Sequence, residues 1–330
     1  MAKIKALLAL TGMLAGLLAG LALAFDEAQA QPAADFPNRP VRIIVPFAPG
    51  GSTDTLSRLL SSELSQTWGQ PIVIENRGGA NGQIAMTAAL SLPPDGYNLV
   101  ITTSGTHNMN PWMVSKLQYD PAKTTHIIKL IDAPYALFVP AKAPVNSMQE
   151  FIAWAKARAK PPAYGYAGAS YEVIIRDLMN TTGIKALGVP YKAQAQAHTD
   201  LFGDTLDFLV DATYVVQPFA DEGRVKVLMV TSRERSPLLP NTPTMVEAGL
   251  PAFKPTVWVG IAGPAGMSPD LVDKIAKDVE KAIQSRTVMQ RAATLGMEVR
   301  VLKGDEFRSF VDAQTVIWGD AIKAANIEPQ

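Results

Sequence analysis

The chain has 330 residues, 48% of them hydrophobic and 18% charged, and thirty basic side chains balance thirty acidic ones. This length suggests two domains. The zero net charge argues against a nucleic-acid partner, which would require a basic surplus. The absence of cysteine excludes disulfides, thiolate metal sites and a cysteine nucleophile. The three histidines have no ligand spacing, so we predict neither a metal nor a cofactor.

The N-terminus has the order of regions found in a secretory signal peptide. Lys3 and Lys5 precede an apolar run that ends at Ala24, and Ala28-Gln29-Ala30 supplies a small-x-small cleavage sequence. Cleavage after Ala24 is an alternative. An uncleaved anchor is another, because the run approaches the roughly 20 residues that span a bilayer. We expect cleavage near Ala30, because small residues suit a peptidase, and therefore an exported protein.

In the first part of the mature chain, β-branched runs alternate with patterns of helical period. A strand over 41–45 leads through a Gly-rich loop into a helix that carries Leu56, Leu60 and Leu64 on one face. The next expected elements are a strand over 72–74, an Ala-rich helix ending near Pro93 and a strand over 98–103. This alternation predicts a largely parallel sheet flanked by helices.

After a connecting strand over 136–139 the alternation begins again. The further expected elements are helices over 151–159, 171–182, 269–284 and 305–324, and strands over 164–166, 208–210, 225–230 and 257–262. We interpret the chain as an α/β protein of two lobes with two strands crossing between them. The expected boundaries are a signal peptide over 1–30, lobe I over 31–133 and 258–330, and lobe II over 134–257.

Two loops rich in Gly and Ser each lie between a strand and the start of a helix. They are Gly50-Gly51-Ser52-Thr53-Asp54 and Gly168-Ala169-Ser170-Tyr171. The first N–H groups of a helix lack partners and carry partial positive charge, so such loops can hold an anion without Arg or Lys. The alternative is a plain N-cap worth about 1 kcal/mol. Asp54 would repel an anion, so we expect it to orient its loop.

Enzyme signatures are absent from the sequence. It has no GxSxG elbow, no Walker A lysine and no GxGxxG motif. Ser104 and Ser170 are possible nucleophiles, but the isolated histidines argue against an oriented catalytic triad. We therefore predict that the protein is not an enzyme, with a hydrolase that uses Ser170 as an alternative.

Several motifs in order and spacing resemble the Bug-type substrate-binding proteins of tripartite tricarboxylate transporters. The matching segments are Phe36 to Asp54, Val73 to Gly82, Pro94-Asp95-Gly96-Tyr97, Asn110-Pro111, Val189-Pro190-Tyr191-Lys192, Pro240 to Thr244, Glu247-Ala248-Gly249 and Gly263 to Gly266. The resemblance extends over essentially all of the mature chain.

The resemblance implies a periplasmic, two-lobed type II binding-protein fold, here expected as a monomer. It closes around a carboxylate-bearing solute and delivers it to integral-membrane permease subunits. The ligand-binding residues that it implies are Phe47, Ala48, Gly50, Gly51, Ser52, Thr53, Asp54, Thr103, Ser104, Thr106, His107, Ala167, Gly168, Ala169, Ser170 and Tyr171, with Tyr191 and Asp211 near the distal end of the ligand.

The chain departs from the family pattern in two places on the side that selects the distal part of the ligand. Ala193-Gln194 replaces a usual glycine pair or Gly-Ser, and Ser170-Tyr171-Glu172 replaces a motif that often holds glycine and histidine. The ligand is therefore left open as a mono- or dicarboxylate, aliphatic or aromatic, such as a phthalate stacked on Tyr171 and Tyr214. A sensor role at a histidine-kinase ectodomain is the alternative to transport.

Overall fold

The computed structural model describes residues 35–167, 169–191, 194–232, 234–250 and 256–329. The expected signal peptide lies outside these residues. Every helix and strand given below belongs to the compact unit Pro37–Gln330. Within the described part of the chain, no helix is long and apolar enough to cross a membrane.

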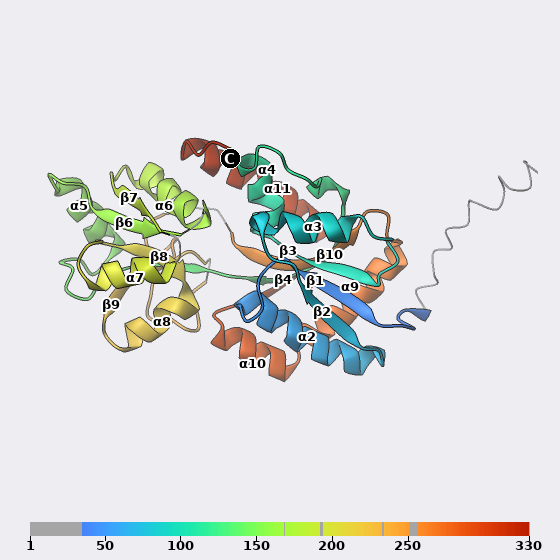
Figure 1. Cartoon of the computed structure of the whole chain (residues 1–330). Coiled ribbons are helices and arrows are strands. Elements are labelled where there is room, and N and C mark those ends of the chain that lie inside the picture. Colours follow the sequence, from blue (N-terminus) through green and yellow to red (C-terminus); the bar gives the residue numbers. More distant parts are fainter. Residues whose placement is uncertain (1–34, 168, 192–193, 233, 251–255, 330) are drawn as a thin grey trace, which may run out of the picture. The chain divides into compact units, whose positions relative to one another are not determined.

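A six-stranded sheet forms the centre of the part that we call lobe I (Figure 1). Its strands are β1 (Val41–Val45), β2 (Ile72–Asn76), β3 (Asn98–Thr103), β4 (Thr124–Asp132), β10 (Trp258–Pro264) and β11 (Glu298–Lys303), in the spatial order β11-β4-β10-β3-β1-β2. β1 pairs in parallel with β2 and β3, whereas β10 pairs antiparallel with β3 and β4, and β11 antiparallel with β4.

The prediction of a largely parallel sheet is confirmed for the three strands on which it rested, β1, β2 and β3, whereas the sheet as a whole is mixed because β4, β10 and β11 pair antiparallel. β4 leads the chain out of this sheet, and β10 brings it back beside β4 after residues 133–257 have been built elsewhere. β10 begins at the edge of the sheet where β4 ends, with Trp258 paired to Asp132, so the two strands run in opposite directions. The antiparallel pairing of β10 with β4 thus follows from the excursion of the chain into a second lobe.

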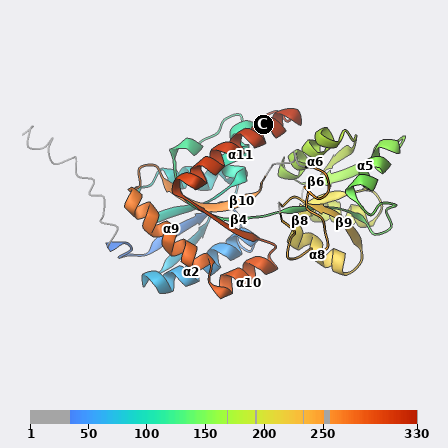
Figure 2. The same cartoon turned by 180° about the vertical axis from the view of Figure 1, so that it is seen from behind.

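Helices cover both faces of this sheet. They are α2 (Ser52–Trp68), α3 (Gln83–Leu90), α4 (Asn110–Met113), α9 (Pro269–Ile283), α10 (Arg286–Thr294) and α11 (Gly304–Ala324). α3 lies on one side, with α2 and α10 on the other, and the view from behind shows α9 and α11 in front of the strands (Figures 1 and 2). The side chains of Leu56, Leu60 and Leu64 are buried on one face of α2, as their spacing predicts.

The part that we call lobe II contains two smaller sheets. β5 (Tyr135–Pro140) lies between β8 (Leu209–Ala212) and β9 (Val225–Val230) with antiparallel pairing, and β6 (Ala163–Tyr166) pairs in parallel with β7 (Leu187–Pro190). The helices of this lobe are α5 (Met148–Ala157), α6 (Ala169–Thr182), α7 (Gln194–Phe202) and α8 (Thr213–Asp221).

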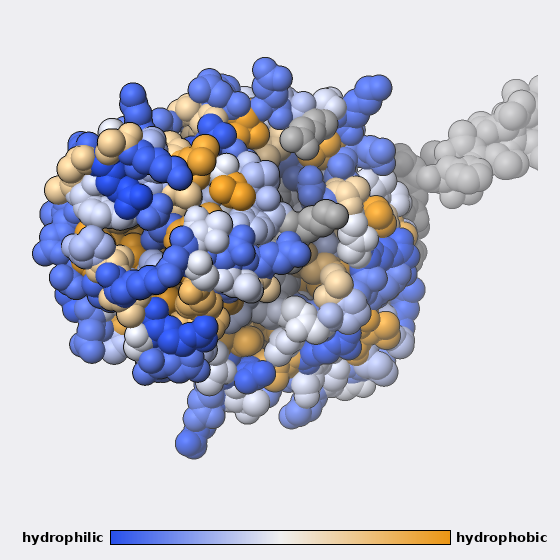
Figure 3. Space-filling model, turned by 60° about the vertical axis from the view of Figure 1, so that its left-hand side comes forward, coloured by the Kyte–Doolittle hydropathy of each residue, from blue (hydrophilic) through white to orange (hydrophobic). Residues whose placement is uncertain are grey.

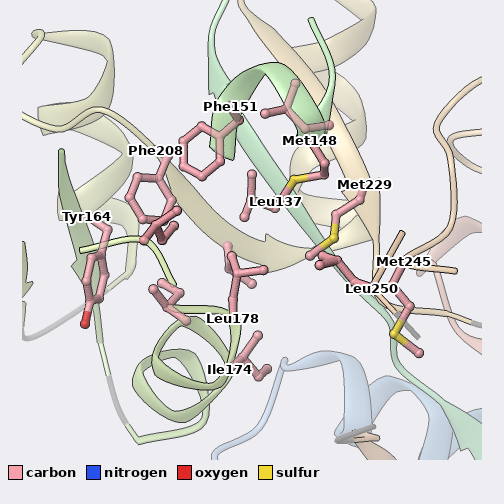
Figure 4. Close-up of a cluster of buried hydrophobic side chains, with 14 of the residues drawn as sticks. Leu137, Met148, Phe151, Tyr164, Ile174, Leu178, Phe208, Met229, Met245 and Leu250 are labelled. Atoms are coloured by element: carbon pink, nitrogen blue, oxygen red, sulfur yellow. The ribbon is translucent and has the colours of Figure 1, made fainter. Parts of the chain in front are cut away.

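The core of lobe II is a cluster of aromatic, aliphatic and methionine side chains (Figure 4). The rings of Phe151 and Phe208 meet with their centroids 5.0 Å apart, and Leu178 of α6 belongs to the same cluster. The cluster also includes Trp318 and Ile322 of α11, so the final helix packs against lobe II as well as lobe I. Hydrophilic side chains predominate on the face shown in Figure 3, where apolar residues occur in small groups.

Two chain segments cross between the lobes and are hydrogen-bonded to each other. One is Ala133-Pro134, between β4 and β5, and the other is Thr256-Val257, which leads into β10. The backbone N–H of Ala133 donates to the carbonyl of Val257 at 2.8 Å.

Candidate functional site

A cavity of about 380 Å³ lies where the two lobes meet the crossing segments. Ligand sites commonly have volumes of about 300–1,000 Å³. Its lining residues come from both lobes and from the crossing segments, and they are Phe47, Ser52, Thr53, Asn81, Thr103, Ser104, Gly105, Thr106, Met109, Asn110, Met113, Ile131, Ala133, Pro134, Tyr135, Ser170, Tyr171, Ala212, Tyr214, Val257, Trp258, Val259, Leu295, Gly296 and Met297. None of these described lining residues carries a charged side chain.

Asp54 fixes the conformation of the loop between β1 and α2. Its carboxylate, which is nearly fully buried, accepts hydrogen bonds from the Gly50 backbone N–H at 2.9 Å, Arg58 Nε at 3.0 Å and Asn76 Nδ2 at 2.9 Å. Burial alone would raise the pKa of Asp54, but the hydrogen bonds from Arg58, Gly50 and Asn76 outweigh it and lower that pKa. The carboxylate therefore serves to orient the loop, as the sequence predicts, and it does not line the cavity.

The chain after β3 closes into a tight turn that presents hydroxyl groups to the cavity. Thr106 Oγ1 accepts a hydrogen bond from the Thr103 N–H at 3.0 Å, and the Thr106 N–H donates to Thr103 Oγ1 at 3.3 Å. Asn110 Nδ2 donates to the carbonyl of Asn81 at 2.9 Å, which ties this turn to the loop before α3. Both asparagines belong to segments that carry the family resemblance, and both line the cavity.

His107 points away from the cavity into the core of lobe I. Its ring contacts Thr102 Oγ1 and lies 5.5 Å from the ring of His126 and 6.0 Å from that of Trp258, centroid to centroid. Burial, together with the neighbouring His126, lowers the pKa of His107 from 6.5 to about 3. The imidazole is therefore neutral over the physiological range of pH and acts as a packed hydrogen-bonding group.

The buried histidines give a testable dependence of stability on pH. An unfolded His107 takes up a proton below about pH 6.5, whereas the folded one stays neutral down to about pH 3, so this residue stabilises the fold above pH 6.5 and loses that contribution as pH falls. Chemical unfolding at about pH 7 and pH 5 should therefore show a larger loss of unfolding free energy for the wild type than for His107→Gln.

The comparison with the variant is needed because other groups act in the opposite direction. Burial raises the pKa of Glu298 to about 7, and this group contributes stability at low pH that is lost as pH rises. Glu298 is present in both proteins, so its contribution cancels from the difference. Equal losses in wild type and His107→Gln would show that His107 does not titrate as its burial implies.

The lobe II side of the cavity is formed by tyrosines at the start of α6, β5 and α8. The rings of Tyr135 and Tyr171 meet edge to face with centroids 5.5 Å apart. The Tyr171 hydroxyl donates to Asp211 Oδ1 at 3.3 Å, and His198 Nε2 lies 2.8 Å from Asp211 Oδ2. Burial first, then nearby charged or polar groups that include Asp211, raise the pKa of both Tyr135 and Tyr171, so both phenols stay protonated.

The structure brings together part of the residue set that the resemblance implies. Those that line the cavity are Phe47, Ser52, Thr53, Thr103, Ser104, Thr106, Ser170 and Tyr171. Those described residues that do not line it are Ala48, Gly50, Gly51, Asp54, His107, Ala167, Tyr191 and Asp211. Gly168 and the side chain of Ala169 lie outside the described residues. Tyr191 instead donates its hydroxyl to Asp200 Oδ2 at 2.6 Å.

Sequence reasoning missed the residues that the crossing segments and a lobe I turn bring to the cavity. Tyr135, Val257 and Trp258 lie in or beside the crossing segments and line the cavity. Leu295, Gly296 and Met297 form the turn between α10 and β11. Neither of these two elements was expected, so nothing in the sequence indicated that turn.

Known structures of similar sequence share this architecture. The periplasmic binding protein BugD is 31% identical with a TM-score of 0.71, and the match covers 89% of this chain and 100% of that one. Rpa4515 of R. palustris, solved with adipate, is 31% identical with a TM-score of 0.76 over 90% and 100%. MatC of Rhodopseudomonas palustris, with bound malate, is 31% identical with a TM-score of 0.70 over 87% and 100%.

The comparisons confirm the predicted two-lobed periplasmic binding-protein fold and the predicted family. The model of the tripartite tricarboxylate transporter family receptor matches residues 56–327, most of the chain. The family and the similar structures are solute-binding receptors, and this overturns the alternative of a hydrolase that uses Ser170. The chain is therefore a periplasmic solute-binding receptor and belongs to the tripartite tricarboxylate transporter receptor family.

Proposed function

We propose that this receptor binds an organic carboxylate in the cavity between its lobes and delivers it to membrane permease subunits. The observation that carries the proposal is that hydroxyl-bearing residues at the N-terminal end of α2 and in the turn after β3 line the cavity. Similar proteins solved with adipate and malate support the class of ligand, and the transporter family of the receptor supports the permease.

The start of α2 supplies the chemistry for a carboxylate. Its N-cap residue, Gly51, makes no side-chain cap, so no side chain of that residue occupies the first N–H groups of the helix. Ser52 and Thr53 follow it and line the cavity. Main-chain N–H groups at a helix N-terminus and adjacent hydroxyl donors together stabilise an anion without a cationic side chain. This arrangement suits a receptor that must release its ligand.

The proposed mechanism includes closure of the lobes about the crossing segments. We assign 31–133 and 258–330 to lobe I and 134–257 to lobe II, because the strands of the sheets divide at these positions. Ser170 and Tyr171 of lobe II face the same cavity as Ser52 of lobe I. A ligand that contacts both lobes stabilises the closed form, which is the form that a permease would recognise. A signal peptide over 1–30 would direct the protein to the periplasm.

A thermal-shift screen tests the ligand class. A carboxylate present at 100 times its dissociation constant should add about 2.7 kcal/mol of stability and raise the melting temperature by several degrees. Aliphatic and aromatic carboxylates should produce shifts, and neutral sugars of similar size serve as controls. A shift with sugars or with cations, and with no carboxylate, would contradict the proposal.

A further inference from the structure

We propose that the ligand carries a single carboxylate and that its other end, on the lobe II side of the cavity, is uncharged and apolar. This inference rests on the proposed function and narrows it. It distinguishes the chain from the similar proteins whose structures contain adipate or malate.

The two sides of the cavity wall differ in chemical character. Serine and threonine hydroxyl groups line the lobe I side at Ser52, Thr53, Thr103, Ser104 and Thr106, whereas the aromatic rings of Tyr135, Tyr171 and Tyr214 form most of the lobe II wall, with Ser170 beside them. Among the described lining residues there is no Arg, Lys or His to pair with a second carboxylate. An ionised group that leaves water requires a charged or hydrogen-bonding partner, and its burial without one is costly.

The buried charge behind the lobe II wall is negative. Asp211 is 3% exposed, and its carboxylate contacts the Tyr171 hydroxyl, the Ala212 N–H and His198. His198 is not among the lining residues, so its side chain does not form part of the cavity wall. A second ligand carboxylate would therefore meet a buried acid behind Tyr171 and no cation in front of it.

Lobe II has few hydrogen-bond donors that could bind a second carboxylate. The Tyr171 hydroxyl is already directed to Asp211, at 3.3 Å. Glu172 adds another acid to the first turn of α6 and pairs with Arg176 at 2.7 Å. Tyr171 is thus committed to Asp211, and Arg176 to Glu172, while Ser170, Tyr135 and Tyr214 carry the other hydroxyl groups of this wall. An aromatic ring or an alkyl chain, which buries apolar surface against the tyrosines, needs no donor.

Two matched pairs of ligands test the inference by isothermal titration calorimetry on the full mature receptor. The first pair is p-toluate and terephthalate, and the second is hexanoate and adipate, so each pair differs by one carboxylate at similar length. We expect the monoacid of each pair to bind roughly tenfold or more tightly, because the diacid must leave a carboxylate unpaired.

A charge-removing variant identifies the cause. Asp211→Asn keeps the shape of the side chain and a hydrogen-bond acceptor for Tyr171, and it should narrow the difference in affinity within each pair of ligands. Asp221→Asn, the same change at an exposed position of α8, should leave that difference in affinity unchanged. If Asp211→Asn does not fold, the wild-type ratios still decide the proposal. Equal or tighter binding of the diacids overturns this inference and leaves the proposed function standing. Binding of none of the four acids, together with no shift from any carboxylate in the thermal-shift screen, overturns the proposed function itself.

Discussion

Replacing Ser52 with glutamate should weaken the binding of any carboxylate by about a thousandfold while leaving the protein folded. Ser52 is the first residue of α2 and lines the cavity. A new carboxylate there would occupy the anion site and repel the ligand, and two like charges about 4 Å apart interact by about 4 kcal/mol at the effective dielectric of a protein surface. Acidic side chains in the first turn of a helix are themselves stabilising by about 0.3–1 kcal/mol, so folding should not suffer.

The control is Ser52→Gln, which has nearly the same size as glutamate and no charge. It removes one hydroxyl donor and should cost roughly tenfold in affinity, the value of one hydrogen bond to a charged group. Calorimetry with the best carboxylate from the thermal-shift screen, and circular dichroism for the fold, would measure both variants. Equal affinities for the glutamate and glutamine variants would place the carboxylate elsewhere in the cavity.

The elements that sequence reasoning found share a strong local signal. The bounds of β1, β3 and β9 match their expected ranges because each is a short segment in which β-branched and other apolar residues predominate, with a single charged or amide residue in each. The amphipathic helices α2 and α9 were also found, since their apolar residues recur at helical spacing. In these segments local preference and tertiary burial agree.

The strands that were not predicted from the sequence are stabilised by long-range pairing and lack a strong local pattern. β4, a central strand of lobe I, contains His126 and the buried Lys129, whose Nζ reaches Asp132 at 2.6 Å and the Arg300 carbonyl at 3.1 Å. A lysine in a sequence is typical of an exposed position, so its burial in a central strand cannot be predicted before its partners are known. β7 is short and contains glycine and proline, and β11 has charged residues at Glu298, Arg300 and Lys303 between its apolar ones; each lies at a sheet edge.

Of the residues that form the site, only those in the loops could be predicted from the sequence. The residues at the start of α2 and after β3 were expected to face the ligand, and Ser52, Thr53 and Thr103 line the cavity. His107 sits beside them in sequence but turns inward, because the chain adopts a π-helical turn over Gly105–Met109 that no sequence signal announced. Trp258 enters the cavity only because β10 returns between β3 and β4, a matter of topology rather than of local pattern.

Trp258→Ala should destabilise lobe I by about 3–5 kcal/mol, the usual cost of removing a buried tryptophan. The side chain is fully buried, packs edge to face against Phe307 at 5.3 Å, and donates from Nε1 to Asn108 Oδ1 at 2.7 Å. Asn108 also donates to the Val311 carbonyl at 2.9 Å. The side-chain amide of Asn108 therefore links Trp258 of β10 to α11 and helps to hold this helix on the sheet. The melting temperature should fall by on the order of 10 °C, measured without ligand by calorimetry.

Trp258→Phe separates the two contributions. It retains a ring against Phe307 but leaves Asn108 Oδ1 without its buried donor, so the loss should be smaller, about 1–3 kcal/mol. Because Trp258 also forms part of the cavity wall, the alanine variant should bind the ligand more weakly as well, since the enlarged cavity contacts it less closely. If the alanine and phenylalanine variants melt at the same temperature, the hydrogen bond rather than the packing of the indole ring is what stabilises this junction of β10 and α11.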